Sequence, residues 1–177
     1  MSSQREVDTH DTAFAGNLVR EKTPRGDIIE TLKNCRLFSE LTELQIQRVA
    51  GVFEFMEYTA GDVIFQQGEL GDRISIINKG MVHLERNVNL GDRKATVTVS
   101  ALGPCRLIGC WSCLLGKPNY HTESAVCHTP TRVITARGAD LREIFETDPH
   151  ITNCLLTALC FMLGDKARNI YGAMESL

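Results

Sequence analysis

A glycine-punctuated stretch from residue 55 to residue 134 constrains the fold more than any other feature of this sequence. Turn signals recur there roughly every 8–12 residues, which is typical of an all-β sandwich or barrel. Helical segments do not alternate with the β-rich runs, so a parallel α/β sheet is not expected. The β-rich runs are residues 63–65, 74–77, 81–88, 96–101, 122–128 and 131–136.

Glycines separate these runs, and glycine readily adopts the positive φ angles that tight turns need. We therefore predict turn positions with positive φ rather than chemistry at six of them. They are Gly61, Gly68, Gly71, Gly80, Gly91 and Gly103.

Helical patterns flank the β region. Apolar spacing predicts helices over residues 27–38 and 42–53. Thr42 and Gln45 form a capping-box pattern at the start of the second helix. Further helices are predicted at residues 110–115, inside the β region, at 139–146, and from Pro149 to about residue 174.

These patterns divide the chain into three parts. Residues 1–26 are predicted to be a mobile N-terminal arm, and residues 27–150 a β-roll with N-terminal helices. Residues 151–177 are predicted to be a C-terminal helix that mediates a homodimer. Its apolar stripe has two interpretations, packing on its own domain or a dimer seam with near-heptad spacing. The stripe consists of Ile151, Leu155, Ala158, Leu159 and Met162.

Composition excludes several classes of function. The 177 residues carry a net charge of −3, so a large basic face for nucleic acid or membrane is not expected. Nothing resembles a membrane span or a secretory signal. Seven cysteines without an export signal predict reduced thiols and a cytoplasmic location. No catalytic motif is present, so we predict neither an enzyme nor a cofactor or metal.

The order of these elements resembles the cyclic-nucleotide-binding domain, the sensor domain of catabolite-activator-type regulators. The resemblance covers residues 35–165 and implies a double-stranded β-helix (jelly roll), mainly β with flanking helices and a long C-terminal helix. It rests on the motifs at residues 37–41, 58–72, 78–82, 102–104 and 108–109, with Pro118 and Ala125.

The family binds its ligand with a short cassette inside the roll. A glycine permits a sharp turn, and the following short helix offers free N–H groups to a phosphate. The resemblance implies an acidic residue directly after the glycine and an arginine directly after the proline. Here Gly109 and Pro118 are kept, but Cys110 and Asn119 stand at the acidic and arginine positions.

We therefore predict a stand-alone regulatory or sensor module whose cyclic nucleotide binding is altered or lost. It would take a small anionic ligand, nucleotide-like or other, and signal through its C-terminal helix to a second copy or a protein partner. No DNA-binding domain is expected after that helix. The candidate pocket residues are Gly109, Cys110, Trp111, Ser112, Cys113, Asn119, Tyr120, His121 and Thr122.

Three alternatives use the same residues differently. Cys110 and Cys113 form a C-x-x-C pair that would act as a thiol-based redox sensor if the helix dipole lowered a thiol pKa. Cys105 and His121 could join that pair as zinc ligands. A ligand-free dimeric scaffold is the third alternative.

Overall fold

The computed structural model describes residues 25–89, 91 and 93–175. The predicted arm, residues 1–26, lies outside this part of the chain except for Arg25 and Gly26, which open the first helix. The helices are α1 (Arg25–Asn34), α2 (Glu43–Ala50), the 3₁₀ helix η1 (Trp111–Leu115), α3 (Gly138–Thr147) and α4 (Pro149–Glu175). None of these described helices has the length and apolar character needed to cross a membrane.

The strands form two four-stranded antiparallel sheets and one short ribbon. One sheet has the order β1-β10-β4-β7, the other has the order β2-β9-β5-β6, and β3 pairs with β8. The strands are β1 (Glu54–Tyr58), β2 (Val63–Phe65), β3 (Leu70–Gly71), β4 (Arg73–Lys79), β5 (Val82–Asn89), β6 (Lys94–Leu102), β7 (Leu107–Gly109), β8 (Asn119–Tyr120), β9 (Ser124–Cys127) and β10 (Thr131–Arg137). This arrangement confirms the predicted jelly roll with flanking helices.

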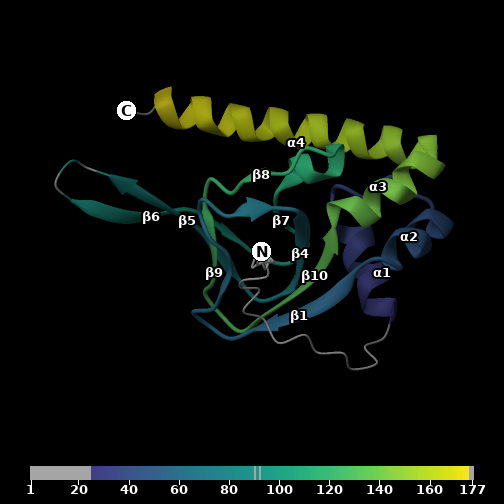
Figure 1. Ribbon diagram of the computed structural model, residues 1–177, viewed down its shortest axis with the longest axis horizontal. Coiled ribbons are helices and arrows are strands. Elements are labelled where there is room, and N and C mark those ends of the chain that lie inside the picture. The colour runs from purple at the N-terminus through teal and green to yellow at the C-terminus, as the bar shows by residue number, and fades with distance from the viewer. Residues whose placement is uncertain (1–24, 90, 92, 176–177) are drawn as a thin grey trace, which may run out of the picture.

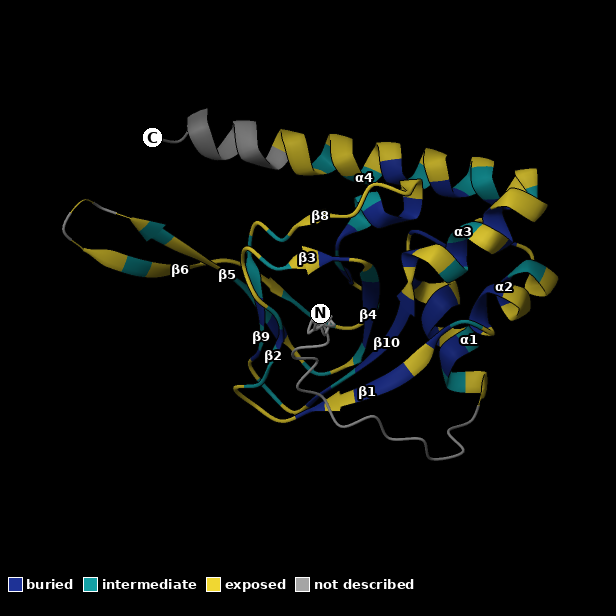
Figure 2. Ribbon diagram, viewed as in Figure 1, coloured by how far each residue is buried: buried dark blue, intermediate teal, exposed yellow. Residues whose placement is uncertain are grey.

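The first sheet is buried on both faces. Successive side chains of a strand point to opposite faces, and in β4 Ile76 belongs to the cluster under the helices while Ile77 belongs to the cluster between the sheets. Ile134 and Val133 divide in the same way on β10. The sheet therefore supports the helical layer on one side and closes the roll on the other (Figure 2).

Helices α1, α2 and α3 pack at one end of the roll, and the β5–β6 hairpin projects from the other (Figure 1). At the start of α2, Thr42 and Gln45 form both hydrogen bonds of the predicted capping box. Predicted helix 27–38 instead begins at Arg25 and ends at Asn34, and residues 35–40 form turns. The helix predicted at residues 110–115 is a 3₁₀ helix of five residues.

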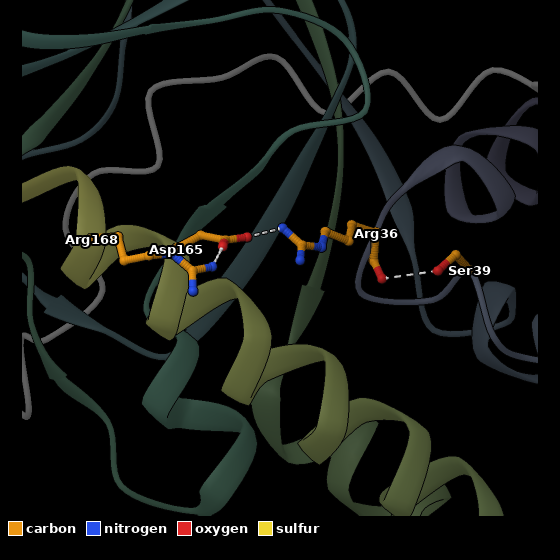
Figure 3. A network of polar contacts seen from close by, with 4 residues as sticks. All are labelled: Arg36, Ser39, Asp165 and Arg168. Atoms are coloured by element: carbon orange, nitrogen blue, oxygen red, sulfur yellow. Dashed lines mark hydrogen bonds and ion pairs between the residues drawn. The ribbon is translucent and has the colours of Figure 1, made fainter.

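Helix α4 lies across the roll above η1 and β8 (Figure 1). Ile151, Leu155 and Leu159 are buried in the main core, so this stripe packs on its own domain and does not form a dimer seam in this arrangement. Further along, Asp165 forms ion pairs with Arg36, from the turn after α1, and with Arg168 (Figure 3). The backbone oxygen of Arg36 also accepts a hydrogen bond from Ser39 Oγ.

Two of the six glycine predictions are wrong. Gly61, Gly68, Gly80 and Gly91 have positive φ, but Gly71 and Gly103 do not. A Cβ at Gly71 would lie 2.5 Å from Cys110 Cβ and 2.6 Å from His121 Nε2. Close approach of these two side chains, rather than backbone conformation, is the physical reason for glycine at position 71.

Candidate ligand-binding site

The candidate pocket begins where β7 turns into η1. Gly109 has a φ of 104°, and a Cβ there would lie 2.7 Å from the backbone oxygen of Arg73. Since backbone cannot yield as a flexible side chain can, this position requires glycine. The turn directs residues 110–115 away from the sheet and into the short helix, as the cassette resemblance implies.

Cys110 faces the other end of the cassette. Its Sγ atom accepts a hydrogen bond from the backbone N–H of Asn119 at 3.3 Å and lies 3.2 Å from Ser112 Oγ. The residue is only 8% exposed. The thiol therefore joins the start of the cassette to its end. Position 110 is where the resemblance implies a carboxylate that would contact a ligand.

Residues 119–121 are held against residues 68–71. Strand β8 pairs with β3, and beyond it the N–H of His121 donates to the Glu69 oxygen at 2.8 Å. The N–H of Gly68 donates to the His121 oxygen, also at 2.8 Å. Asn119 and Tyr120 are exposed, and Asn119 Oδ1 accepts a hydrogen bond from the N–H of Tyr120. Asn119 thus supplies no positive charge to the pocket.

His121 closes the space over Gly71. Its ring stacks on Phe65 with centroids 3.9 Å apart and planes inclined by 14°. Burial lowers the pKa of His121, and the nearby Glu69 and Asp72 carboxylates oppose that shift. A neutral imidazole therefore fills this part of the candidate pocket and would have to move for a ligand to contact Cys110.

Cys113 lies on the side of η1 that faces α3. It is 2% exposed, its backbone oxygen accepts a hydrogen bond from Arg142 Nη1, and its Sγ would be 2.6 Å from a Cβ at Gly138. Burial raises the pKa of the Cys113 thiol to about 12. A thiol that stays protonated at neutral pH is a poor nucleophile, so this geometry does not favour the Cys110–Cys113 redox alternative.

Trp111 contacts the C-terminal helix. It packs against the main core, and Lys166 Nζ lies 5.9 Å from the centre of its ring. Leu114 and Leu115 line a cavity of about 280 Å³ between η1, α3 and α4. The short helix therefore contacts α4 directly. A displacement of η1 would change these contacts with α4. The remaining residues lining this cavity are Arg142, Phe145, Glu146, Thr152, Leu155, Leu156 and Leu159.

Two charged residues near the pocket were not predicted from the sequence. Arg86 on β5 donates to the Thr122 oxygen and pairs with Glu123, both at 3.3 Å. The Glu123 side chain is 12% exposed, so the cassette ends on a half-buried ion pair. The two residues are 37 positions apart, and only the pairing of β5 with β9 brings them together.

The structure thus divides the predicted residues into two groups. Cys110 and His121 meet over Gly71, Ser112 and Asn119 contact Cys110 Sγ, and Gly109 directly precedes Cys110. Trp111 and Cys113 face the helices, whereas Thr122 is exposed and Tyr120 points to solvent with 66% of its surface exposed.

Metal binding has no support in the part of the chain that the structure describes. There, no three His, Cys, Asp or Glu side chains are grouped so that they could hold a metal ion. The zinc alternative on Cys105, Cys110, Cys113 and His121 therefore lacks its ligand arrangement.

Comparison with known proteins identifies the fold and the family. The chain is 27% identical over 141 residues to a CRP-like cAMP-activated global transcriptional regulator of Mycobacterium tuberculosis, covering 80% of this chain and 61% of that protein. It is 35% identical over 68 residues to the cGMP-dependent protein kinase egl-4 of Caenorhabditis briggsae, covering 38% of this chain and only 9% of the kinase.

A solved structure of a cyclic nucleotide-binding domain from Methylobacillus flagellatus superposes with a TM-score of 0.70 at 19% identity. It covers 84% of this chain and 81% of that one, which establishes the fold. The cyclic nucleotide-binding domain family matches residues 55–148, more than half of the sequence. With the jelly roll and the Gly109 cassette in place, this chain belongs to the cyclic nucleotide-binding domain family.

Proposed function

We propose that this chain is a non-enzymatic regulatory module whose cyclic nucleotide pocket is altered, so that tight binding of cyclic AMP or cyclic GMP is lost. One observation carries the proposal. The Cys110 thiol accepts a hydrogen bond from the backbone N–H of Asn119, and the His121 ring lies over Gly71. These contacts occupy the place where a cyclic nucleotide would need open space and a positive charge for its phosphate. A buried charge-assisted pair with phosphate is worth roughly 1.5–3 kcal/mol, and Asn119 cannot form one.

The ligand class that we propose for this site is an anion that differs from cyclic AMP and cyclic GMP in size or in charge. The first turn of η1 leaves backbone N–H groups without helical partners. Lys117 and Arg106 are the cations nearest to the cassette in sequence. The ligand would have to displace His121 from Phe65. Binding would therefore move the segment of residues 119–121.

Isothermal titration of the full chain with cyclic AMP and cyclic GMP tests the altered pocket. We expect no sub-micromolar binding to the wild-type protein. The matched double variant Cys110→Glu with Asn119→Arg restores the acid and the guanidinium, and we expect it to gain affinity. Sub-micromolar binding by the wild type would contradict the proposal.

We further propose that α4 is the output element and that it pairs with a second copy. The exposed face of α4 carries a heptad pattern of its own, because its apolar or small residues recur at intervals of four, three and four. Leu156 is 42% exposed and Leu163 is 55% exposed, so both leave apolar surface on this face that a second helix could cover. This second stripe consists of Leu156, Cys160, Leu163 and Ala167.

Sedimentation measurements test the homodimer. The wild type is expected to sediment as a dimer, and the double variant Leu156→Glu with Leu163→Glu as a folded monomer. A matched control, Leu44→Glu, alters another exposed leucine, on α2 and outside this second stripe, and should leave the dimer intact. A wild-type protein that is monomeric at tens of micromolar would contradict this part of the proposal. It would also contradict the alternative of a ligand-free dimeric scaffold, which needs the same dimer surface.

A further inference from the structure

We infer that Cys154 is a thiol-modification site, activated by His150, which takes small disulfides such as oxidised glutathione. Both residues lie on the first turns of α4, four positions apart and therefore on one helix face. Cys154 Sγ lies 3.7 Å from His150 Nδ1, within hydrogen-bonding reach for sulfur. This pair is separate from the cassette and from Cys110 and Cys113.

The tautomer of His150 follows from its neighbours. In the capping box of α2, the N–H of Thr42 donates to Gln45 Oε1 at 3.1 Å, and Thr42 Oγ1 also donates to it at 3.0 Å. The amide nitrogen of Gln45 therefore points to α4, where it donates to Asp148 Oδ2 and lies 3.2 Å from His150 Nδ1.

An amide NH₂ group can only donate, so Nδ1 must carry its lone pair and the ring proton is on Nε2. That lone pair is shared: it accepts from the Gln45 amide and also faces the Cys154 S–H, so it takes the thiol proton only when the Gln45 contact opens. A base in reach of a thiol, itself oriented by a third group, is the arrangement that activates a nucleophile. In the resting state Gln45 orients the ring as a positioning residue, and once Nδ1 is protonated its amide keeps only the bond to Asp148 Oδ2.

The exchange step balances without another reactant. The Cys154 proton moves to His150 Nδ1, and the thiolate attacks one sulfur of the small disulfide. A new S–S bond forms at Cys154 as the original S–S bond breaks, and the departing thiolate takes the proton from His150. The protein gains a mixed disulfide, and one free small thiol is released.

Accessibility distinguishes Cys154 from most of the other thiols. Cys35, Cys110, Cys113 and Cys127 are buried, whereas Cys154 and Cys105 are partly exposed and Cys160 is exposed. Cys154 lies on the opposite side of α4 from Leu156 and Leu163, since each residue advances the helix by about 100°. A dimer through that second stripe would leave Cys154 open.

Modification at this position has a structural consequence. Cys154 also packs against the main core, close to where Gln45 of α2 contacts α4. A glutathionyl group on Cys154 would add bulk beside this contact, and we expect it to loosen the first turns of α4 from α2. Because α4 is our proposed output helix, the adduct would change its position.

The test uses the full chain carrying Cys160→Ser, incubated with oxidised glutathione at neutral pH and followed by peptide mass spectrometry. We expect Cys154 to be modified at least roughly tenfold faster than Cys105, the matched partly exposed thiol, and His150→Gln to remove this advantage. His150 is exposed, so the variant should keep its fold, which circular dichroism checks.

Equal rates at Cys154 and Cys105, or an unchanged Cys154 rate in His150→Gln, would overturn the inference. A second measurement uses iodoacetamide, which transfers its carboxamidomethyl group to sulfur and releases iodide. If His150 acts as the base, the variant slows both reactions. If it only shapes a binding site for glutathione, alkylation is unaffected and the inference fails.

Discussion

The ring of His121 lies parallel to the ring of Phe65, 3.9 Å away, and covers Gly71. Phe65 ends β2, and His121 directly follows β8, so the stack joins two edges of the roll across the candidate pocket. Such aromatic contacts contribute roughly 0.5–1.5 kcal/mol beyond the area that they bury. The pocket is therefore closed by a contact that a ligand could displace.

Gly71→Ala is expected to destabilise the protein. The added methyl group would lie within 2.6 Å of both Cys110 and His121, and overpacking of this kind costs about 1–3 kcal/mol. Urea denaturation measures the loss, and a change in tryptophan fluorescence would report the displaced cassette. Gly103→Ala is the matched control, because nothing lies within 4 Å of the position that its methyl group would take, and it should change stability by less than about 1 kcal/mol. Equal effects in both variants would contradict the packing role of Gly71.

His121 makes stability depend on pH. Burial lowers its pKa in the folded state from the ordinary value of 6.5, so the unfolded chain binds the proton more readily. Its contribution is complete above pH 6.5 and is lost as the pH falls below that value. His121→Phe keeps an aromatic ring on Phe65 but cannot titrate. The difference in unfolding free energy between the two proteins should therefore shift in favour of the variant on acidification from pH 7.5 to about 5. A difference that stays constant would mean that His121 is not buried as described.

Apolar burial, rather than the Arg36–Asp165 ion pair, is expected to hold α4 on the domain. Leu155 is 3% exposed in the main core, and Leu155→Ala should cost about 2–5 kcal/mol in chemical denaturation. Arg36→Gln should have no measurable effect, because the Arg36 and Asp165 side chains are 57% and 36% exposed and solvent screens the pair. A larger loss of unfolding free energy from Arg36→Gln than from Leu155→Ala would show that the ion pair, and not apolar burial, holds α4 on the domain.

Cys160 provides a direct check of the proposed dimer. In a parallel pair of α4 helices, the same position of each copy meets across the seam. Mild oxidation should therefore yield a disulfide-linked dimer on a non-reducing gel. Cys160→Ser should abolish the dimer band and Cys154→Ser should retain it. Cross-linking that survives Cys160→Ser would place the seam elsewhere.

Local sequence signals were sufficient for the fold. The turn spacing and β-rich runs predicted an all-β sandwich or barrel, the family resemblance implied the jelly roll, and Thr42 with Gln45 predicted a cap that the structure confirms. These features depend on residues close together in the chain, where turn geometry and side-chain period act directly. The family resemblance located the cassette at Gly109, and the structure shows the positive φ there that favours glycine.

Contacts between distant segments could not be predicted in this way. The sequence, with its family resemblance, predicted the roll and its flanking helices and placed Cys110 and Asn119 at the family's acidic and arginine positions. Only the tertiary structure decided that Gly71 is a point of close packing, that the Ile151–Leu159 stripe faces its own core, and that Gln45 of α2 lies 3.2 Å from His150 of α4. The reason is physical: which neighbours surround a side chain depends on how sheets and helices pack, and one sequence records the side chains but not their distant neighbours.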